Sequence, residues 1–153
     1  MELGIVSALS LLLVAATVIV HYEFLRGLSG LTEHLSVFRR AQILVVIGGV
    51  FFAHLAEVTL YAIAYYVVQT WMGPGRIDGE IEGGALDFFY FSITTYTTLG
   101  VGDLHPRGPL RLIAGVESLN GLVLIGWSAS FTYLEMARFW EDGPLRSELS
   151  RRR

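Results

Sequence analysis

The chain alternates long apolar stretches with short polar breaks. Residues 4–24 are almost unbroken apolar sequence, and two further apolar stretches follow at residues 41–69 and 109–139. A helix of about 21 residues rises roughly 31 Å, which matches a hydrocarbon core of about 30 Å. We therefore predict three transmembrane helices, the first of which, residues 1–25, is a peripheral one. A cleaved signal peptide is the competing interpretation, but no basic residue precedes this stretch and no small-residue cleavage site follows it.

The segments between these helices differ in character. Residues 26–40 are polar and predict a linker, and the glycine-rich residues 70–85 predict an exposed loop. Residues 86–97 form an aromatic-rich apolar run that is too short to span a bilayer, so we interpret it as a re-entrant helix. Residues 140–153 predict a short tail. The expected fold is an all-α membrane protein with three transmembrane helices, a re-entrant helix and an irregular segment after it.

Arginine placement predicts the orientation, because flanking positive charge is retained on the cytoplasmic side. Eight arginines lie in residues 26–40 or from residue 138 onward, and three lie around the loop at the opposite end. We therefore expect a multi-pass protein of the cell membrane with its N-terminus outside and its C-terminus in the cytoplasm. Residues 26–40 would then be a cytoplasmic linker, and residues 140–153 a cytoplasmic tail.

Composition agrees with a membrane location and excludes several functional classes. Of the 153 residues, 53% are hydrophobic and 16% are charged, against roughly 25% charged residues in soluble domains. Lysine is absent and no basic run is interleaved with aromatic residues, so nucleic acid is not an expected partner. Cysteine is also absent, which removes disulfides, thiolate metal sites and cysteine nucleophiles.

The most informative segment is residues 98–103, which read Thr-Leu-Gly-Val-Gly-Asp. Irregular backbone at membrane depth is tolerated only where protein buries it or water-filled space adjoins it, so this segment predicts a pore lining. A monovalent cation that loses its water needs a ring of oxygen dipoles in its place, and backbone carbonyls can supply that ring. Pointing successive carbonyls inward requires alternate residues in conformations that L-residues avoid, which Gly100 and Gly102 tolerate. Thr98 adds a hydroxyl oxygen.

At these residues the chain resembles the pore-loop potassium channel superfamily, in particular its small bacterial two-helix members, whose filter usually reads T-x-G-Y-G-D. The resemblance covers residues 41–139 as outer helix, pore helix, selectivity filter and inner helix. It implies that Asp103 closes the outer mouth of the filter. The ion-coordinating filter that it implies comprises Thr98, Leu99, Gly100, Val101, Gly102 and Asp103. The potassium ligands within it are the carbonyls of Thr98, Leu99, Gly100 and Val101, with the Thr98 hydroxyl.

The resemblance also implies partners. One chain supplies one pore loop, which cannot enclose an ion, so four copies around an axis are expected to form a homotetramer. Membrane lipids and monovalent cations are the other expected partners, and no cofactor is expected besides the permeant potassium ions. The helix at residues 1–25 is additional to the two-helix unit. It is expected to pack at the periphery or against a neighbouring subunit.

Val101 departs from the family pattern, which most often has tyrosine at this position. The tyrosine hydroxyl of that pattern braces the filter, and valine has no donor to replace it. Passive potassium conduction is the favoured function, and a less selective monovalent cation channel is the nearest alternative. A non-conducting membrane scaffold and a re-entrant glycine loop without a permeant ion are also open. An enzyme is not expected, because no nucleophile, base and orienting group share a helix face.

Two carboxylates interrupt the apolar stretches. An ionised Glu57 or Glu117 at such a position costs a few kcal/mol unless it is paired. Glu117 falls near the depth of the filter, and we expect it to accept hydrogen bonds from Thr94 or Thr95. With Thr97, these residues form the expected support behind the filter, without direct contact to the ion.

His54, Glu57 and Tyr61 recur at helical spacing and therefore share one face of their helix. A hydrogen-bonded contact between helices is the preferred interpretation, and a proton-sensing pair that gates the pore is the alternative. A His-x-x-Glu pair could begin a metal site, but no second such pair exists to complete one. The resemblance implies that the inner helix bends at a glycine, such as Gly121 or Gly126, to open the pore. Close helix packing is the other open role for these glycines.

Overall fold

The structure, a computed structural model, describes residues 2–34, 39–73, 75–80 and 84–141. These residues are almost all helical, as the apolar pattern predicts. In chain order the elements are α1 (Glu2–His34), α2 (Arg39–Val67), the π-helical turn η1 (Val68–Met72), β1 (Arg76–Gly79), α3 (Ala85–Tyr96), β2 (Leu104–Arg107) and α4 (Leu110–Glu141). The all-α fold class is therefore confirmed, with one short two-stranded ribbon added.

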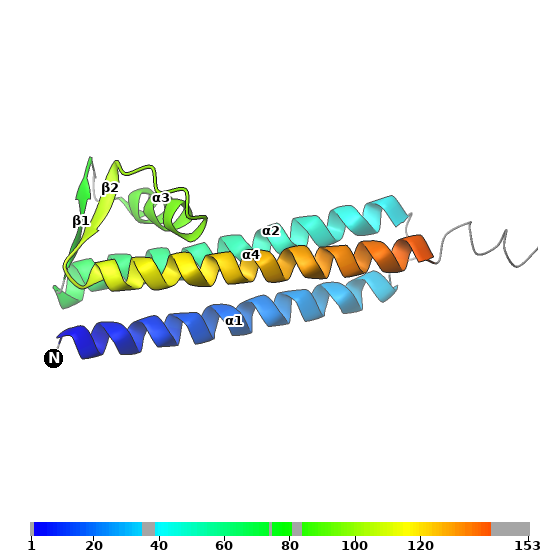
Figure 1. The fold of residues 1–153 in the computed structure, drawn as a ribbon, viewed down its shortest axis with the longest axis horizontal. Helices are drawn as coiled ribbons and strands as arrows, with labels where there is room; N and C mark the ends of the chain where they lie inside the picture. Colours follow the sequence, from blue (N-terminus) through cyan, green and yellow to red (C-terminus); the bar gives the residue numbers. More distant parts are fainter. Residues whose placement is uncertain (1, 35–38, 74, 81–83, 142–153) are drawn as a thin grey trace, which may run out of the picture.

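Three long helices lie side by side along the molecule, and Figure 1 shows α1 and α3 on opposite sides of the α2–α4 pair. α1 packs against α2 and α4, and α3 packs against the same two helices. The long helices are apolar enough to cross a membrane over Leu3–Thr32, Ala41–Trp71 and Leu110–Arg138. α3 has 12 residues, which is too few to cross. The chain is thus a multi-pass membrane protein with a short helix beside its spanning helices.

The predicted linker at residues 26–40 is wrong over most of its length, because α1 continues through residue 34 and α2 begins at residue 39. Leu28 and Thr32 are buried at a spacing of four residues, so they extend the packed face of α1 beyond its most apolar stretch. Tertiary packing therefore overrides the polar composition of this segment.

Two further expectations concern the loop at residues 70–85 and the tail at residues 140–153. The predicted exposed loop at residues 70–85 instead contains the end of η1 and all of β1, and β1 pairs antiparallel with β2. Asp78 on β1 forms ion pairs with Arg76 and with Arg107 of β2. Composition alone predicted a plain loop because the pairing strand lies beyond α3 in the chain. The predicted tail at residues 140–153 lies almost wholly outside the described residues.

An apolar core fixes α3 against α2 and α4. Phe88 and Phe91 are buried on α3, and the Phe91 ring lies edge-on to Tyr65 of α2 with 4.9 Å between ring centroids. This edge-to-face arrangement is a favoured geometry for aromatic pairs. The same core includes Ile113 of α4. The packing therefore sets where α3 ends and where the segment after it begins.

α4 passes close to the end of α3 at Gly121. A Cβ atom at this position would lie 2.2 Å from the carbonyl oxygen of Tyr96, the last residue of α3. Close packing of α4 on α3 therefore requires a glycine at residue 121. A Cβ atom at Gly126 would meet nothing within 4 Å. α4 is one continuous helix through both glycines.

Replacing Gly121 by alanine should destabilise the fold. The added methyl group would overlap a backbone carbonyl that cannot rotate away, and overpacking of this kind costs about 1–3 kcal/mol. We expect a lower thermal unfolding temperature for G121A, measured by circular dichroism in detergent. The matched variant G126A should unfold at or above the wild-type temperature, since alanine favours a helix over glycine by about 1 kcal/mol. Equal unfolding temperatures for the two variants would contradict the packing argument.

Candidate functional site

The segment after α3 has an alternating backbone. Thr98, Gly100 and Gly102 have φ angles of 58°, 54° and 90°, whereas Leu99 and Val101 between them are not at positive φ. Alternation of this kind turns successive carbonyls toward one side of the chain. Thr98 is the single non-glycine residue at positive φ among the described residues. This conformation costs a threonine on the order of 1–3 kcal/mol unless its surroundings hold it.

Carbonyls at the end of α3 hold this segment. The Thr98 amide donates to the Thr95 carbonyl at 2.9 Å, and the Gly100 amide donates to the Thr94 carbonyl at 3.1 Å. Ser118 of α4 also donates its hydroxyl to the Thr95 carbonyl, at 2.9 Å. The last turn of a helix leaves carbonyls without partners in the helix, so these bonds satisfy groups that α3 leaves free. The support expected from Thr94 and Thr95 thus comes from their backbone oxygens.

The hydroxyls of Thr94 and Thr97 bind backbone carbonyls of α3. The Thr94 hydroxyl donates to the Tyr90 and Phe91 carbonyls, each at 3.0 Å, and the Thr97 hydroxyl donates to the Ile93 carbonyl at 2.7 Å. They therefore turn back onto their own helix. These local bonds leave neither hydroxyl directed at Glu117.

Asp103 marks the far end of the segment. Its carboxylate accepts the Leu104 amide at 2.9 Å and anchors the start of β2. It also accepts a hydrogen bond from the exposed Tyr90 of α3, and this bond raises the pKa of the Tyr90 phenol. Asp103 thus ties the end of the segment to the exposed surface of α3, a contact that the sequence did not reveal.

The two ends of α3 carry opposite partial charges of the helix dipole. Asp87 in the first turn accepts the Gly84 amide at 3.1 Å and places negative charge at the N-terminal end. The partly negative end of the helix dipole lies at Tyr96, directly before the alternating segment. Two side chains of that segment are exposed in the single chain: Leu99 is 68% exposed and Val101 is 57% exposed.

A buried carboxylate cluster lies between α3 and α4. Glu117 is fully buried, and it accepts a hydrogen bond from Ser92 of α3 at 2.6 Å and another from Tyr65 of α2. Ser92 also contacts the Val58 carbonyl of α2, at 2.8 Å. Glu117 therefore binds α3 and α2, and the expected partners Thr94 and Thr95 are wrong. Ser92 takes their place because it lies on the face of α3 that α2 and α4 cover.

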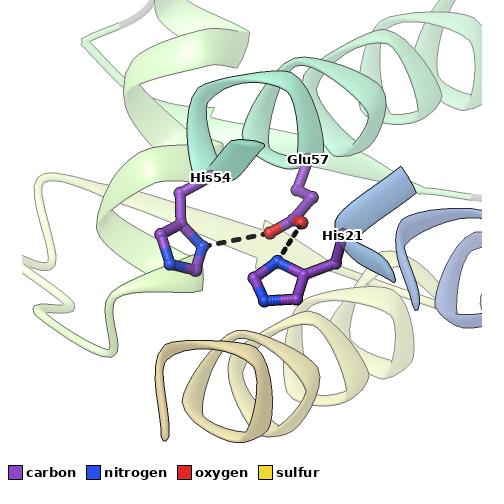
Figure 2. A group of neighbouring side chains, drawn as sticks. All are labelled: His21, His54 and Glu57. Atoms are coloured by element: carbon purple, nitrogen blue, oxygen red, sulfur yellow. Dashed lines mark hydrogen bonds and ion pairs between the residues drawn. The ribbon is translucent and has the colours of Figure 1, made fainter. Parts of the chain in front are cut away.

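A second buried carboxylate, Glu57, belongs to a polar cluster that joins all four helices, and we call it the histidine cluster: His21, His54, Glu57, Tyr96 and Ser128. Glu57 contacts His21 Nδ1 of α1 at 2.8 Å and His54 Nδ1 at 3.1 Å (Figure 2). It also accepts the Tyr96 hydroxyl at the end of α3. Sequence reasoning paired His54 with Glu57 and missed the other three members.

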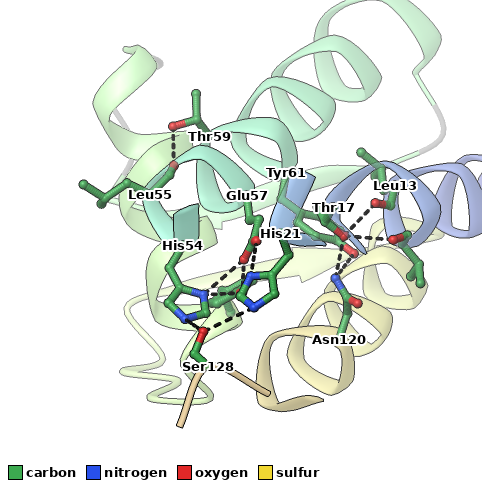
Figure 3. A network of polar contacts seen from close by, with 12 residues as sticks. Leu13, Thr17, His21, His54, Leu55, Glu57, Thr59, Tyr61, Asn120 and Ser128 are labelled. Atoms are coloured by element: carbon green, nitrogen blue, oxygen red, sulfur yellow. Dashed lines mark hydrogen bonds and ion pairs between the residues drawn. The ribbon is translucent and has the colours of Figure 1, made fainter. Parts of the chain in front are cut away.

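A third polar contact lies beside the histidine cluster (Figure 3). Asn120 of α4 donates to the Thr17 hydroxyl of α1 at 2.8 Å and approaches the Tyr61 hydroxyl at 3.3 Å. His54 and Glu57 contact each other as expected from their shared helix face, whereas Tyr61 on the same face binds Asn120 instead. Polar side chains within apolar helices are the signal that could have identified His21, Thr17 and Asn120.

Comparison with known proteins identifies relatives. A family model described as "Ion channel" matches residues 41–136. Two-pore potassium channel 1 of Arabidopsis thaliana is 36% identical over 69 residues, which cover 44% of this chain and 18% of that protein. The inward rectifier potassium channel Kirbac3.1 of Paramagnetospirillum magnetotacticum is 31% identical over 86 residues, which cover 56% of this chain and 28% of that protein. The matched region thus spans less than a third of the length of either curated relative.

Removing the Tyr65 hydroxyl should reveal the contribution of the Glu117 cluster. Y65F would leave a fully buried carboxylate with Ser92 as its remaining hydrogen-bond donor among the described residues. An unsatisfied buried polar group costs about 1–3 kcal/mol, so thermal unfolding in detergent should occur at a lower temperature. Y66F is the matched control, because the neighbouring Tyr66 is 45% exposed and keeps its ring against Phe88. An equal loss in both variants would contradict a specific role for the Tyr65 hydroxyl.

Proposed function

Since this chain belongs to the ion channel family, we propose that it conducts potassium ions passively across the membrane through a pore formed by four copies. The family is one of channels and not of enzymes. Both curated relatives are potassium channels by name, which supports potassium as the permeant ion. Conduction through backbone oxygens needs no cofactor.

The alternating backbone at residues 98–102 is the observation that carries this proposal. Left-handed residues at Thr98, Gly100 and Gly102 allow a row of carbonyl oxygens on one side of the chain. Such a row, repeated around an axis, replaces the hydration shell of a cation. We assign the ion-coordinating positions to residues 98–101, with the Thr98 hydroxyl below them and Asp103 at the outer mouth.

Four copies would complete the pore. One row of carbonyls cannot surround an ion, and closed rings of identical chains are the common solution. Leu99 and Val101 offer exposed apolar side chains beside the carbonyl row, and α4 exposes Leu119, Leu122 and Val123. These surfaces suit contact with neighbouring copies or with lipid. The spanning helices α2 and α4 would form the pore unit, with α1 outside it.

Orientation in the membrane follows from charge. Most arginines of the described residues, namely Arg26, Arg39, Arg40 and Arg138, lie toward the end of the molecule where α1 and α4 end, so we place that end in the cytoplasm. The N-terminus and the β1–β2 ribbon lie together at the opposite end (Figure 1), which would face outward. The filter would then open toward the outside, with Asp103 next to the ribbon. Gly126 stays a predicted bending point of the inner helix.

Potassium flux from liposomes tests conduction. The purified protein should discharge a potassium gradient without any substrate, and G100A should abolish this flux. Gly100 has a φ of 54° with no atom near its missing Cβ, so alanine would act through backbone conformation rather than by a clash. G115A is the matched control, because Gly115 lies within α4 and its Cβ position is open. Flux that persists in G100A would count against the filter assignment.

Ion preference needs a separate measurement, because Val101 offers no hydroxyl to brace the filter. With potassium on one side of a planar bilayer and an equal concentration of sodium on the other, the reversal potential should lie far from zero, with the potassium side negative. The backbone carbonyl of Val101 is unchanged by the side chain, and dipole number and field can support selectivity without a rigid diameter. A reversal potential near zero would favour the less selective monovalent cation channel.

A further inference from the structure

In the histidine cluster, four contacts join the imidazole nitrogens to Glu57 and Ser128, and each of these four needs one proton. His21 Nδ1 and His54 Nδ1 face the two oxygens of Glu57, at 2.8 and 3.1 Å. On their other side, His21 Nε2 and His54 Nε2 both approach the Ser128 hydroxyl, at 3.2 and 3.0 Å (Figure 3). The Tyr96 hydroxyl also lies 2.9 Å from His54 Nδ1, but it donates its own proton to Glu57, so it supplies none to these four contacts. The four protons must therefore come from the two imidazoles, Ser128 and Glu57.

The neutral groups supply only three of these protons. Each neutral imidazole carries one N–H and the Ser128 hydroxyl carries one O–H, while an ionised Glu57 carries none. The fourth contact is satisfied only if the cluster holds one additional proton, either on a histidine or on the carboxylate. The count is the same for every tautomer, because moving a proton within the cluster does not change the total.

Charge leads to the same conclusion. With the additional proton the cluster is neutral overall, and without it one negative charge is buried between membrane-spanning helices, which is unfavourable. The ion pairs of Glu57 are with His21 and His54, and among the described residues no arginine contacts it. The other titratable group facing the cluster from α2 is Tyr61, and α4 contributes Ser128 and the Trp127 ring. Glu117 of α4 belongs to the separate cluster with Ser92 and Tyr65.

The cluster reaches the filter through Tyr96. Its hydroxyl binds Glu57 and lies 2.9 Å from His54 Nδ1, while its carbonyl lies against Gly121 of α4. Tyr96 is the last residue of α3 and stands two residues before Thr98, the first residue of the alternating segment. A change in the charge of the cluster therefore acts on the backbone that carries the proposed ion sites.

We propose that the histidine cluster is a binding site for one titratable proton, and that this proton holds Tyr96 in the position that permits conduction. The proposal rests on the proposed channel function. His21 makes α1 part of this site, although the helix lies on the far side of α2 and α4 from α3. The proton is bound at low pH and lost as the pH rises. Conduction is therefore present at low pH and decreases as the pH increases.

Flux measured as a function of pH tests the site. Liposome flux of the wild type should fall several-fold between about pH 5.5 and about pH 8.5, a range that brackets the ordinary histidine pKa. E57Q should lose the pH dependence, because the glutamine amide supplies the missing proton permanently and leaves the cluster neutral. H105Q is the matched control and should keep the wild-type profile, since His105 is exposed on β2, away from the cluster.

A second variant and a second readout separate a loss of the site from a loss of folding. S128A removes the hydroxyl that joins both Nε2 atoms, so the midpoint of the pH profile should shift to lower pH. Nitrogen-15 NMR of labelled histidines should show a change in the protonation or tautomer of His21 or His54 over the pH range in which flux falls.

The outcomes are distinct. Flux that does not depend on pH in the wild type, or a wild-type profile in E57Q, would overturn the proton site and leave the channel function intact. No flux at any pH would instead reject the channel function. His21, His54 and Glu57 also place three ligand atoms within 4.8 Å of one another. A stoichiometric transition metal that copurifies with the wild type and is absent from E57Q would replace the proton by a metal ion and overturn the proposal.

Discussion

One constraint underlies this structure: backbone that is neither helix nor sheet must be held at membrane depth, where lipid offers no hydrogen bonds. The alternating segment at residues 98–102 meets this constraint by using carbonyls that α3 leaves free. Thr94 and Thr95 accept the amides of Gly100 and Thr98, and Ser118 of α4 fixes the Thr95 carbonyl from outside. The position of the segment is therefore decided by the position of α3.

The polar side chains inside the helices also hold α3 in its position. Apolar burial gives little driving force between helices in lipid, so packing and interhelical hydrogen bonds determine how they associate. Glu117 joins α4 to Ser92 of α3, and Glu57 joins α2 to Tyr96 of α3. Among the described residues, every buried side-chain nitrogen or oxygen has a partner. Two carboxylates that look costly in the sequence thus hold α3 from two sides.

α1 takes part in this support although it lies outside the region that matches the family. His21 reaches Glu57, and Thr17 reaches Asn120, so α1 is tied by polar contacts to both α2 and α4. Its apolar composition indicated a peripheral helix, because most of its side chains are equally suited to lipid and to protein. Two of its polar residues, Thr17 and His21, mark the face that packs against α2 and α4.

Local patterns in the sequence determined the long helices, the short helix and the alternating segment, because length, hydropathy and glycine placement act over neighbouring residues. They also identified Glu57 and Glu117 as residues in need of partners. Local spacing paired His54 with Glu57, but tertiary structure decided the other partners of both carboxylates, extended α1 to residue 34 and paired β1 with β2. Those contacts join residues far apart in the chain, and they depend on how each helix is rotated against the next. No local pattern encodes that rotation.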